Sequence, residues 1–325
     1  MEVSEKTVNK TNKNKRLLED VKARFKMLLL GKQGNDGFIL RFVIYFLLIT
    51  IGFVYLYPVL YILAQSMKSL DDLLDPTVVW IPKAFHLENY ITAWKVLDFK
   101  RALTGSLFNS VLPAIAQTIS CAIIGYGLAR FRFPGKNLIL VLMLITFIIP
   151  TQVVMIPLFM MFEKYNMLGT PLPFILPAML GMGIRSALFI LIYMQFFKGI
   201  PTSLEEAAQI DGASATKIFT KIVIPISVPA IVVVYLFSMV WHWNETYTAS
   251  LYLGNSMTTL PIRLQIFHDS FSKMITSNEI QQGANINESI NMAGTMLVIM
   301  PLLILYFFAQ RWFVEATDKT GIAGE

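Results

Sequence analysis

The chain has 325 residues, of which 55% are hydrophobic and only 15% are charged, and its net charge is +6 at pH 7. This composition excludes an ordinary soluble globular protein, whose amphipathic elements carry charged residues along their whole length. The single cysteine, Cys121, excludes an internal disulfide and a cysteine metal cluster, and its place in an apolar run favours a buried thiol. We therefore expect a membrane protein.

Residues 1–41 form a basic segment that precedes the first apolar run. Its lysines and arginines suit the anionic headgroups of a membrane surface better than a nucleic acid, and a solvated tail is the other interpretation that fits. We expect this segment to lie in the cytoplasm next to membrane lipid, with no nucleic-acid partner.

Six stretches are long and apolar enough to cross a bilayer. They do not alternate like barrel strands, and lipid leaves every backbone group to be satisfied within its own segment, so helices are expected. The stretches are Phe42–Ala64, Ser106–Ala129, Leu138–Phe162, Leu172–Phe197, Ile222–Asn244 and Ser289–Gln310. The sequence therefore predicts an all-α membrane protein with six transmembrane helices in a domain over residues 42–310.

Six prolines fall inside or near these stretches, and each removes a backbone donor and bends a helix. Such bends can line a pathway, but ordinary packing between membrane helices explains them equally simply. They are Pro58, Pro113, Pro150, Pro157, Pro177 and Pro301.

The loops between the stretches differ in charge, and this difference predicts the orientation. Basic residues are more numerous in residues 1–41, 130–137, 198–221 and from 311 onward than in the opposite loops. By the positive-inside rule both termini are expected in the cytoplasm. The long loops at about 65–105 and 245–288 are then external, and residues 311–325 form a cytoplasmic tail.

The cytoplasmic loop over residues 198–221 has the local signals of helix, turn, helix. Ser203 and Glu206 have the spacing of a capping box, and Gly212 can take the left-handed conformation that ends a helix. The spacing predicts a helix over 204–211 with Leu204, Ala207, Ala208 and Asp211 on one face. Ser214 can cap a second helix that leads to Pro225 and the fifth span. A helical hairpin lying on the membrane is the simplest interpretation of these signals alone.

The same loop resembles the coupling signature of bacterial ABC importer permeases. That signature reads Glu-Ala-Ala, three residues, Gly, nine residues, Ile, one residue, Leu, Pro. The chain has Glu206-Ala207-Ala208, Gly212, Ile222 and Pro225 at these intervals and departs from it only by Ile224 in place of Leu.

The resemblance extends over about residues 40–316 and is to the carbohydrate branch, in particular the six-span permease of maltose-type systems. The segments that carry it are Ser66-Met67-Lys68, Glu88-Asn89-Tyr90, Arg130-Phe-Arg-Phe-Pro-Gly135, Trp243-Asn244-Glu245 and Gln310-Arg311-Trp312-Phe313-Val314-Glu315. It implies the type I ABC importer permease fold in a bacterial plasma membrane. It also implies a sugar or oligosaccharide as cargo, although glycerol phosphates occur in the same branch.

The resemblance further implies that the chain works with other subunits. These are a second homologous permease subunit, a dimer of ATPase subunits and an extracytoplasmic binding protein that delivers the solute. The chain has no phosphate-binding loop, since Gly135-Lys136 is followed by Asn137 and lacks the upstream glycine. We therefore expect no catalytic residue and no cofactor here, with ATP and magnesium bound by the partner ATPase.

Two groups of residues are candidates for function. The ATPase-coupling candidates implied by the resemblance are Glu205, Glu206, Ala207, Ala208, Asp211, Gly212, Phe219 and Pro225. The translocation-pathway candidates are Arg185, Trp243, Asn244 and Glu245. Arg185 could instead have a structural role or extend its side chain to the membrane–water interface. The other three residues also fit an ordinary aromatic belt at that interface.

Two other classes of function compete with this interpretation. An ion-coupled secondary transporter is expected to have carboxylates deep within its spans, and here Glu245 lies only at an edge. A membrane enzyme would need a catalytic constellation, for which His86, His242 and His268 are the available histidines. Their scatter along the chain argues against such a site, and no metal site is predicted.

Overall fold

The computed structural model describes residues 31–32, 35–277 and 287–321, with side chains for residues 37–277 and 287–312. The described residues divide into two units between Ala64 and Gln65. The first unit holds the two short strands β1 (Gly31–Lys32) and β2 (Asn35–Asp36) and nearly all of helix α2 (Phe38–Ser66). The lysines and arginines predicted to meet the membrane surface lie mostly in residues 1–30, outside the described residues.

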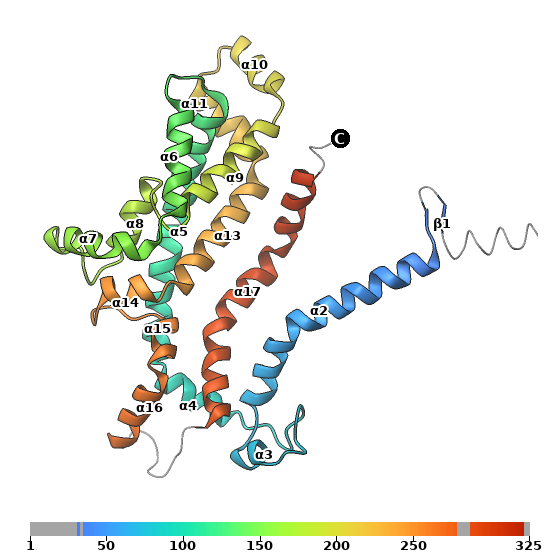
Figure 1. Cartoon of the computed structure of the whole chain (residues 1–325), viewed down its shortest axis with the longest axis vertical. Coiled ribbons are helices and arrows are strands. Elements are labelled where there is room, and N and C mark those ends of the chain that lie inside the picture. Colours follow the sequence, from blue (N-terminus) through green and yellow to red (C-terminus); the bar gives the residue numbers. More distant parts are fainter. Residues whose placement is uncertain (1–30, 33–34, 278–286, 322–325) are drawn as a thin grey trace, which may run out of the picture. The chain divides into compact units, whose positions relative to one another are not determined.

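The second unit is entirely helical where it is described (Figure 1). Its first helices are α3 (Leu70–Leu74), α4 (Glu88–Val96), α5 (Phe99–Arg130), α6 (Lys136–Ile148), α7 (Thr151–Lys164), α8 (Leu172–Met179) and α9 (Ser186–Gly199). Then follow α10 (Thr202–Ile210), α11 (Ala215–Ile218), the π-helical turn η1 (Phe219–Val223), α12 (Ile224–Ile226), α13 (Val228–Asn244), α14 (Tyr247–Leu253), α15 (Leu260–Gln265), α16 (Phe267–Thr276) and α17 (Glu288–Gly321). The chain is thus an all-α membrane protein.

Three helices are by themselves long and apolar enough to cross a bilayer, namely α2, α5 and residues Glu288–Trp312 of α17. Three bent pairs pass the same test when each pair is taken together, which allows up to six spans among the described residues. The predicted run Leu138–Phe162 is not one straight helix, because α6 ends before Pro150 and α7 follows at a bend of 96°. The predicted run Leu172–Phe197 is likewise split into α8 and α9.

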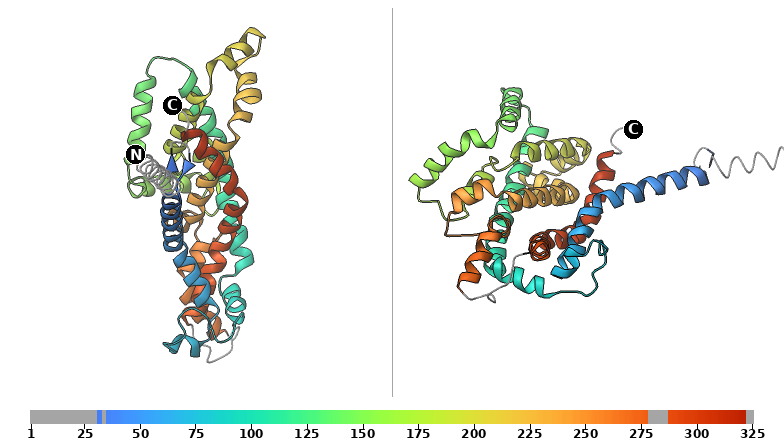
Figure 2. Two further views of the ribbon diagram at one scale, coloured as in Figure 1. Left: turned by 90° about the vertical axis from the view of Figure 1, so that its right-hand side faces the viewer. Right: turned by 60° about the horizontal axis from the view of Figure 1, so that its bottom comes forward.

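Helix α5 lies at the centre of the second unit and packs against α8, α9 and α13. Small residues along it permit this close packing. A methyl group added at Gly125 would lie 2.6 Å from Cβ of Tyr193 in α9, whereas nothing lies within 4 Å of the same position at Gly127. Helix α13 packs against α5 on one side and against α17 on another, and Figure 2 gives two further views of this arrangement.

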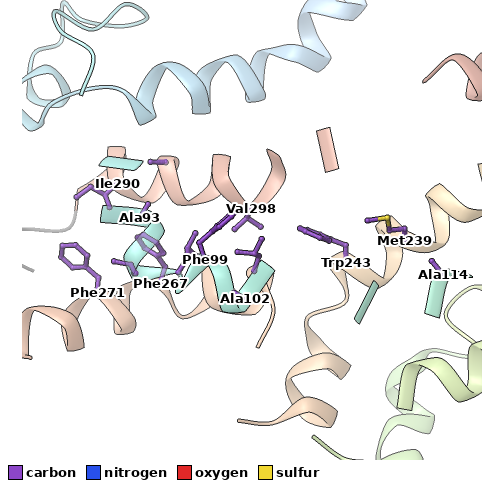
Figure 3. Close-up of a cluster of buried hydrophobic side chains, with 14 residues drawn as sticks. Ala93, Phe99, Ala102, Ala114, Met239, Trp243, Phe267, Phe271, Ile290 and Val298 are labelled. Carbon is purple, nitrogen blue, oxygen red and sulfur yellow. The ribbon is translucent and has the colours of Figure 1, made fainter. Parts of the chain in front are cut away.

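One buried cluster joins α4, α5, α13, α15, α16 and α17 (Figure 3). Phe267 and Phe271 of α16 pack with Phe99 of α5, and Trp243 extends the cluster along α13. A second cluster joins α5 and α9 to the segment from α11 to α13, around Tyr193 and Phe197. These clusters connect the two ends of the unit, where Figure 1 shows α10 and α11 at one end and α3, α4 and α16 at the other.

Hydrogen bonds hold the loop after α2, and they come from the segments Ser66-Met67-Lys68 and Glu88-Asn89-Tyr90. The amide nitrogen of Asn89 donates to the carbonyls of Ser66 and Lys68, both at 2.9 Å. Lys68 is buried and donates to the carbonyls of Val78 and Val79. In the same loop the hydrogen bond from Lys83 to Asp75, 2.6 Å long, holds the pKa of Asp75 well below its usual value. Ser66-Met67-Lys68 and Glu88-Asn89-Tyr90 therefore have a structural role.

Candidate functional site

Helix α10 begins earlier than its sequence predicts. Pro201 is the residue before the helix, and it makes no side-chain capping bond. Its backbone ψ of 128° makes Thr202 the first helical residue, so Ser203 lies within the first turn rather than ahead of it. The predicted capping box between Ser203 and Glu206 is therefore wrong, and the helix runs over Thr202–Ile210 instead of 204–211.

The end of α10 has the geometry that the sequence predicts. Gly212 has a φ of +78°, which glycine adopts without the strain that a Cβ would bring. The N–H of Gly212 donates to the carbonyl of Gln209 at 3.0 Å, and the N–H of Ala213 donates to that of Ala208 at 2.9 Å. This pair of bonds is a Schellman motif. The hydroxyl of Ser214 then accepts from the N–H of Lys217 and caps α11 as predicted.

The inward face of α10 is tied to the end of α5 by a buried ion pair. Arg130 Nε donates to Oε1 of Glu205 at 2.7 Å, and the side chains are only 12% and 9% exposed. Arg130 Nη2 also donates to the carbonyl of Ile200 at 2.7 Å, and the hydroxyl of Tyr126 donates to Oε2 of Glu205 at 3.1 Å. Both carboxylate oxygens are therefore occupied within the chain.

The outward face of α10 carries exposed apolar side chains. Ile210 is 88% exposed and Leu204 is 46% exposed. Glu206, Ala207 and Asp211 are also exposed, whereas Ala208 is half-buried against the second cluster. The predicted face of Leu204, Ala207, Ala208 and Asp211 is thus divided, since Ala208 points toward the chain's own core.

The two remaining coupling candidates lie where the loop returns to the membrane domain. Phe219 opens the π-helical turn η1, and its ring centroid lies 4.8 Å from that of Tyr126. Tyr126 also donates to Glu205, so this one residue of α5 contacts both α10 and η1. Pro225 lies in α12, exposed, just before the bend of 79° into α13.

The four pathway candidates have different surroundings. Arg185 lies between α8 and α9, with its Cζ 4.8 Å from the ring centroid of Trp241 and 5.2 Å from that of Phe147. Trp243 is only 2% exposed and belongs to the buried cluster of Figure 3. Asn244 ends α13, and Glu245 accepts from the N–H of Thr248 at 3.0 Å at the start of α14.

Sequence reasoning missed three residues that the structure makes prominent. Arg130 is in a quoted segment, but its partner is 75 positions away in the chain. Nothing in the sequence distinguished Trp241 from the other apolar residues of its span. Gln117 is a polar residue in the second span, and its side chain donates to the Ile184 carbonyl at 2.7 Å and to the Ser186 hydroxyl at 2.6 Å.

The three histidines of the competing enzyme interpretation lie in separate elements. His86 is in the loop before α4, His242 is buried in α13, and His268 is in α16. Among the described residues no group of three His, Cys, Asp or Glu could hold a metal ion.

Comparison with known proteins relates this arrangement to transport. The chain is 30% identical over 278 residues to the "Probable starch degradation products transport system permease protein AmyC" of Thermoanaerobacterium thermosulfurigenes, which covers 85% of this chain and 94% of that protein. It is 28% identical to the "Arabinooligosaccharides transport system permease protein AraQ" of Halalkalibacterium halodurans, over 85% of this chain and 96% of that protein. It is 30% identical to the "Polygalacturonan/rhamnogalacturonan transport system permease protein YtcP" of Bacillus subtilis, over 86% and 97%.

A solved structure has the same fold. It is described as the "Crystal structure of a bacterial ABC transporter involved in the import of the acidic polysaccharide alginate" and matches with a TM-score of 0.64 and 23% identity, over 85% of this chain and 96% of that chain. Residues 121–319 match the model of a family described as "Binding-protein-dependent transport system inner membrane component". That segment contains α10, the Schellman turn and Glu205. The chain belongs to this family of multi-pass inner-membrane permeases.

Proposed function

We propose that the chain is a permease subunit of an ATP-driven importer that carries sugars or oligosaccharides, and that α10 is its docking point for the ATPase. The observation that carries the docking proposal is the outward face of α10, where Ile210 is 88% exposed. This is the highest exposed fraction among the large apolar side chains of the described residues. A large apolar side chain exposed to this degree would lose contact with water on binding a protein partner, which favours docking at this position.

The shape of α10 suits such docking. Ala207 is small and exposed, so a partner backbone can approach closely, and Glu206 beside it offers a carboxylate for a basic or polar group. The inward face is tied to α5 through Glu205 and Arg130. Movement of a docked ATPase would then shift α10 and α5 together as one rigid body.

The other subunits follow from the family. A binding-protein-dependent transport component requires an external binding protein, and in this proposal separate ATPase subunits bind ATP and magnesium while a second homologous permease completes the pathway. In this proposal the ATPase docks at the α10 end, and both termini lie on the same, cytoplasmic side, as the distribution of basic residues predicts. The names of two relatives refer to starch degradation products and to arabinooligosaccharides, which favours oligosaccharides over glycerol phosphates as cargo.

The test is reconstitution of the complex encoded with this chain in liposomes, with ATP-dependent uptake of labelled oligosaccharides measured beside ATP hydrolysis. Ile210→Glu should abolish retention of the ATPase and reduce uptake at least tenfold, because it places a charge in an apolar contact. Ile81→Glu is the matched control, since Ile81 is 80% exposed at the other end of the unit. Equal behaviour of the two variants would exclude docking through this face.

A further inference from the structure

The break between α8 and α9 has a fixed shape that presents Arg185 outward. Arg185 has a φ of +58°, a left-handed conformation that is unfavourable for a residue with a long side chain. The adjoining backbone is held by Gln117, which donates to the Ile184 carbonyl and the Ser186 hydroxyl. Ser120 donates to the Ala178 carbonyl at 2.6 Å on the other side of the break. Such strain persists where surrounding contacts enforce it, and it is concentrated at functional positions.

Arg185 lies deep within the apolar layer. Helix α9 has 14 residues, so about 21 Å of helix separates Arg185 from the end that leads to α10. By the same rise, Trp241 lies about 20 Å along α13 and Phe147 about 17 Å along α6. The three side chains thus come from three helices at similar depth within a hydrocarbon core about 30 Å thick.

The guanidinium at this depth has aromatic neighbours and no carboxylate partner among the described residues. Trp241 and Phe147 flank it at 4.8 Å and 5.2 Å, while the ion pairs found in the described part of the chain are Lys83–Asp75 and Arg130–Glu205. The Arg185 side chain also makes no hydrogen bond to described residues. All three side chains are exposed, with 40% for Trp241 and 41% for Phe147.

The contact with Phe147 argues against a side chain that reaches toward a lipid headgroup. The guanidinium lies against Phe147 and Trp241, whose positions along their helices correspond to a depth similar to that of Arg185. An arginine that snorkelled to a headgroup would extend away from rings at its own depth. The two rings instead hold the guanidinium at the depth of its own backbone, with its N–H donors available to an acceptor.

We propose that Arg185, Trp241 and Phe147 form a contact site on the translocation pathway for a sugar that carries a carboxylate. The proposal rests on the function proposed above and names the class of its cargo. A planar guanidinium binds a carboxylate through two parallel N–H donors, which a lysine cannot do. The exposed faces of Trp241 and Phe147 provide apolar surface for the C–H groups of the sugar ring.

The test uses the whole reconstituted complex and two matched probes. These are an α-1,4-linked trisaccharide of galacturonate and the same trisaccharide with its carboxylates reduced to alcohols. Wild-type protein should import the acidic form, and Arg185→Gln should lower that uptake roughly tenfold or more while changing uptake of the reduced form little. Arg185→Lys should fall between the two, and Trp241→Ala should lower uptake of both forms.

Arg132→Gln, which removes an exposed arginine near the α10 end, is the control and should transport like wild type. Assembly and ATP hydrolysis of each variant show that the complex is intact. An equal loss for both probes in Arg185→Gln would mean that Arg185 pairs with a neighbouring subunit, and uptake of only the reduced form by wild type would exclude an anionic cargo. Either result overturns the inference and leaves sugar import standing, whereas no uptake of any oligosaccharide would overturn the proposed function itself.

Discussion

Glu205 and Glu206 are neighbours in α10 but have opposite surroundings. Glu205 is buried and holds Arg130 and Tyr126, whereas Glu206 faces outward. The helical period explains this difference, because consecutive residues on a helix lie about 100° apart. One carboxylate therefore stabilises the chain itself, and the other is available to a partner.

Glu205→Ala is expected to loosen α10, because it leaves the Arg130 guanidinium buried without its counter-charge. Removing one member of a buried pair costs about 3 kcal/mol, and amide hydrogen exchange over residues 202–210 should become about a hundredfold faster. The measurement is hydrogen exchange by mass spectrometry on the permease in detergent. Glu206→Ala, the matched control, should leave exchange unchanged and weaken ATPase retention. Equal exchange in the two variants would show that the ion pair does not hold the helix.

At the scale of elements, the packing of α5 against α9 depends on Gly125. A Cβ at this position would lie 2.6 Å from Cβ of Tyr193 and 3.2 Å from the Ile190 carbonyl. Both obstacles are at or next to backbone, so the two helices would have to separate. The cluster around Tyr193 and Phe197 would then lose contact with α5.

Gly125→Ala should therefore lower the melting temperature of the purified permease, with a cost of about 1–3 kcal/mol for an overpacked interface. Gly127→Ala is the control on the same helix, since nothing lies within 4 Å of its added methyl group. Alanine also suits a helix better than glycine by about 1 kcal/mol, so this variant should melt at the same or a higher temperature. A Gly125→Ala protein that melts like Gly127→Ala would contradict the packing assigned to α5 and α9.

Short-range signals in the sequence predicted where helices begin and end better than they predicted which helices contact one another. Gly212 and Ser214 act within a few residues, so the turn and the start of α11 could be predicted from them. Pro201 changed the start of α10, because it takes the position before the helix that Ser203 was expected to hold.

Contacts between distant segments had no such signal. The spacing of Arg130 and Glu205 along the chain gives no indication that they meet, since their contact depends on how α5 and α10 pack. Trp243 and Trp241 lie in the same predicted span, and the sequence does not show that their surroundings differ. The first is buried in the core, and the second flanks Arg185. Pro150 predicted a bend in its span, but it did not predict that the span would divide into two helices, α6 and α7, at an angle of 96°.

At the scale of the whole molecule, α5 relates the coupling loop to the opposite end of the second unit. Its 32 residues extend about 48 Å, which exceeds the roughly 30 Å hydrocarbon core. Its Arg130 end binds α10, and its Phe99 end packs with α16. Residues of α10 and α16 should therefore emerge on opposite sides of the membrane, and the excess of basic residues near α10 predicts that this end faces the cytoplasm.

Single cysteines test this orientation, because Cys121 is 0% exposed and the unmodified chain can serve as its own unlabelled control. Gln209→Cys in α10 and Thr276→Cys in α16 both replace exposed residues. A membrane-impermeant maleimide should label Thr276→Cys in spheroplasts and Gln209→Cys only in inverted vesicles. Ser4→Cys should follow Gln209→Cys if the amino terminus is cytoplasmic. Labelling of Gln209→Cys in intact spheroplasts would reverse the orientation and remove α10 from reach of an ATPase, because ATP is supplied from the cytoplasm.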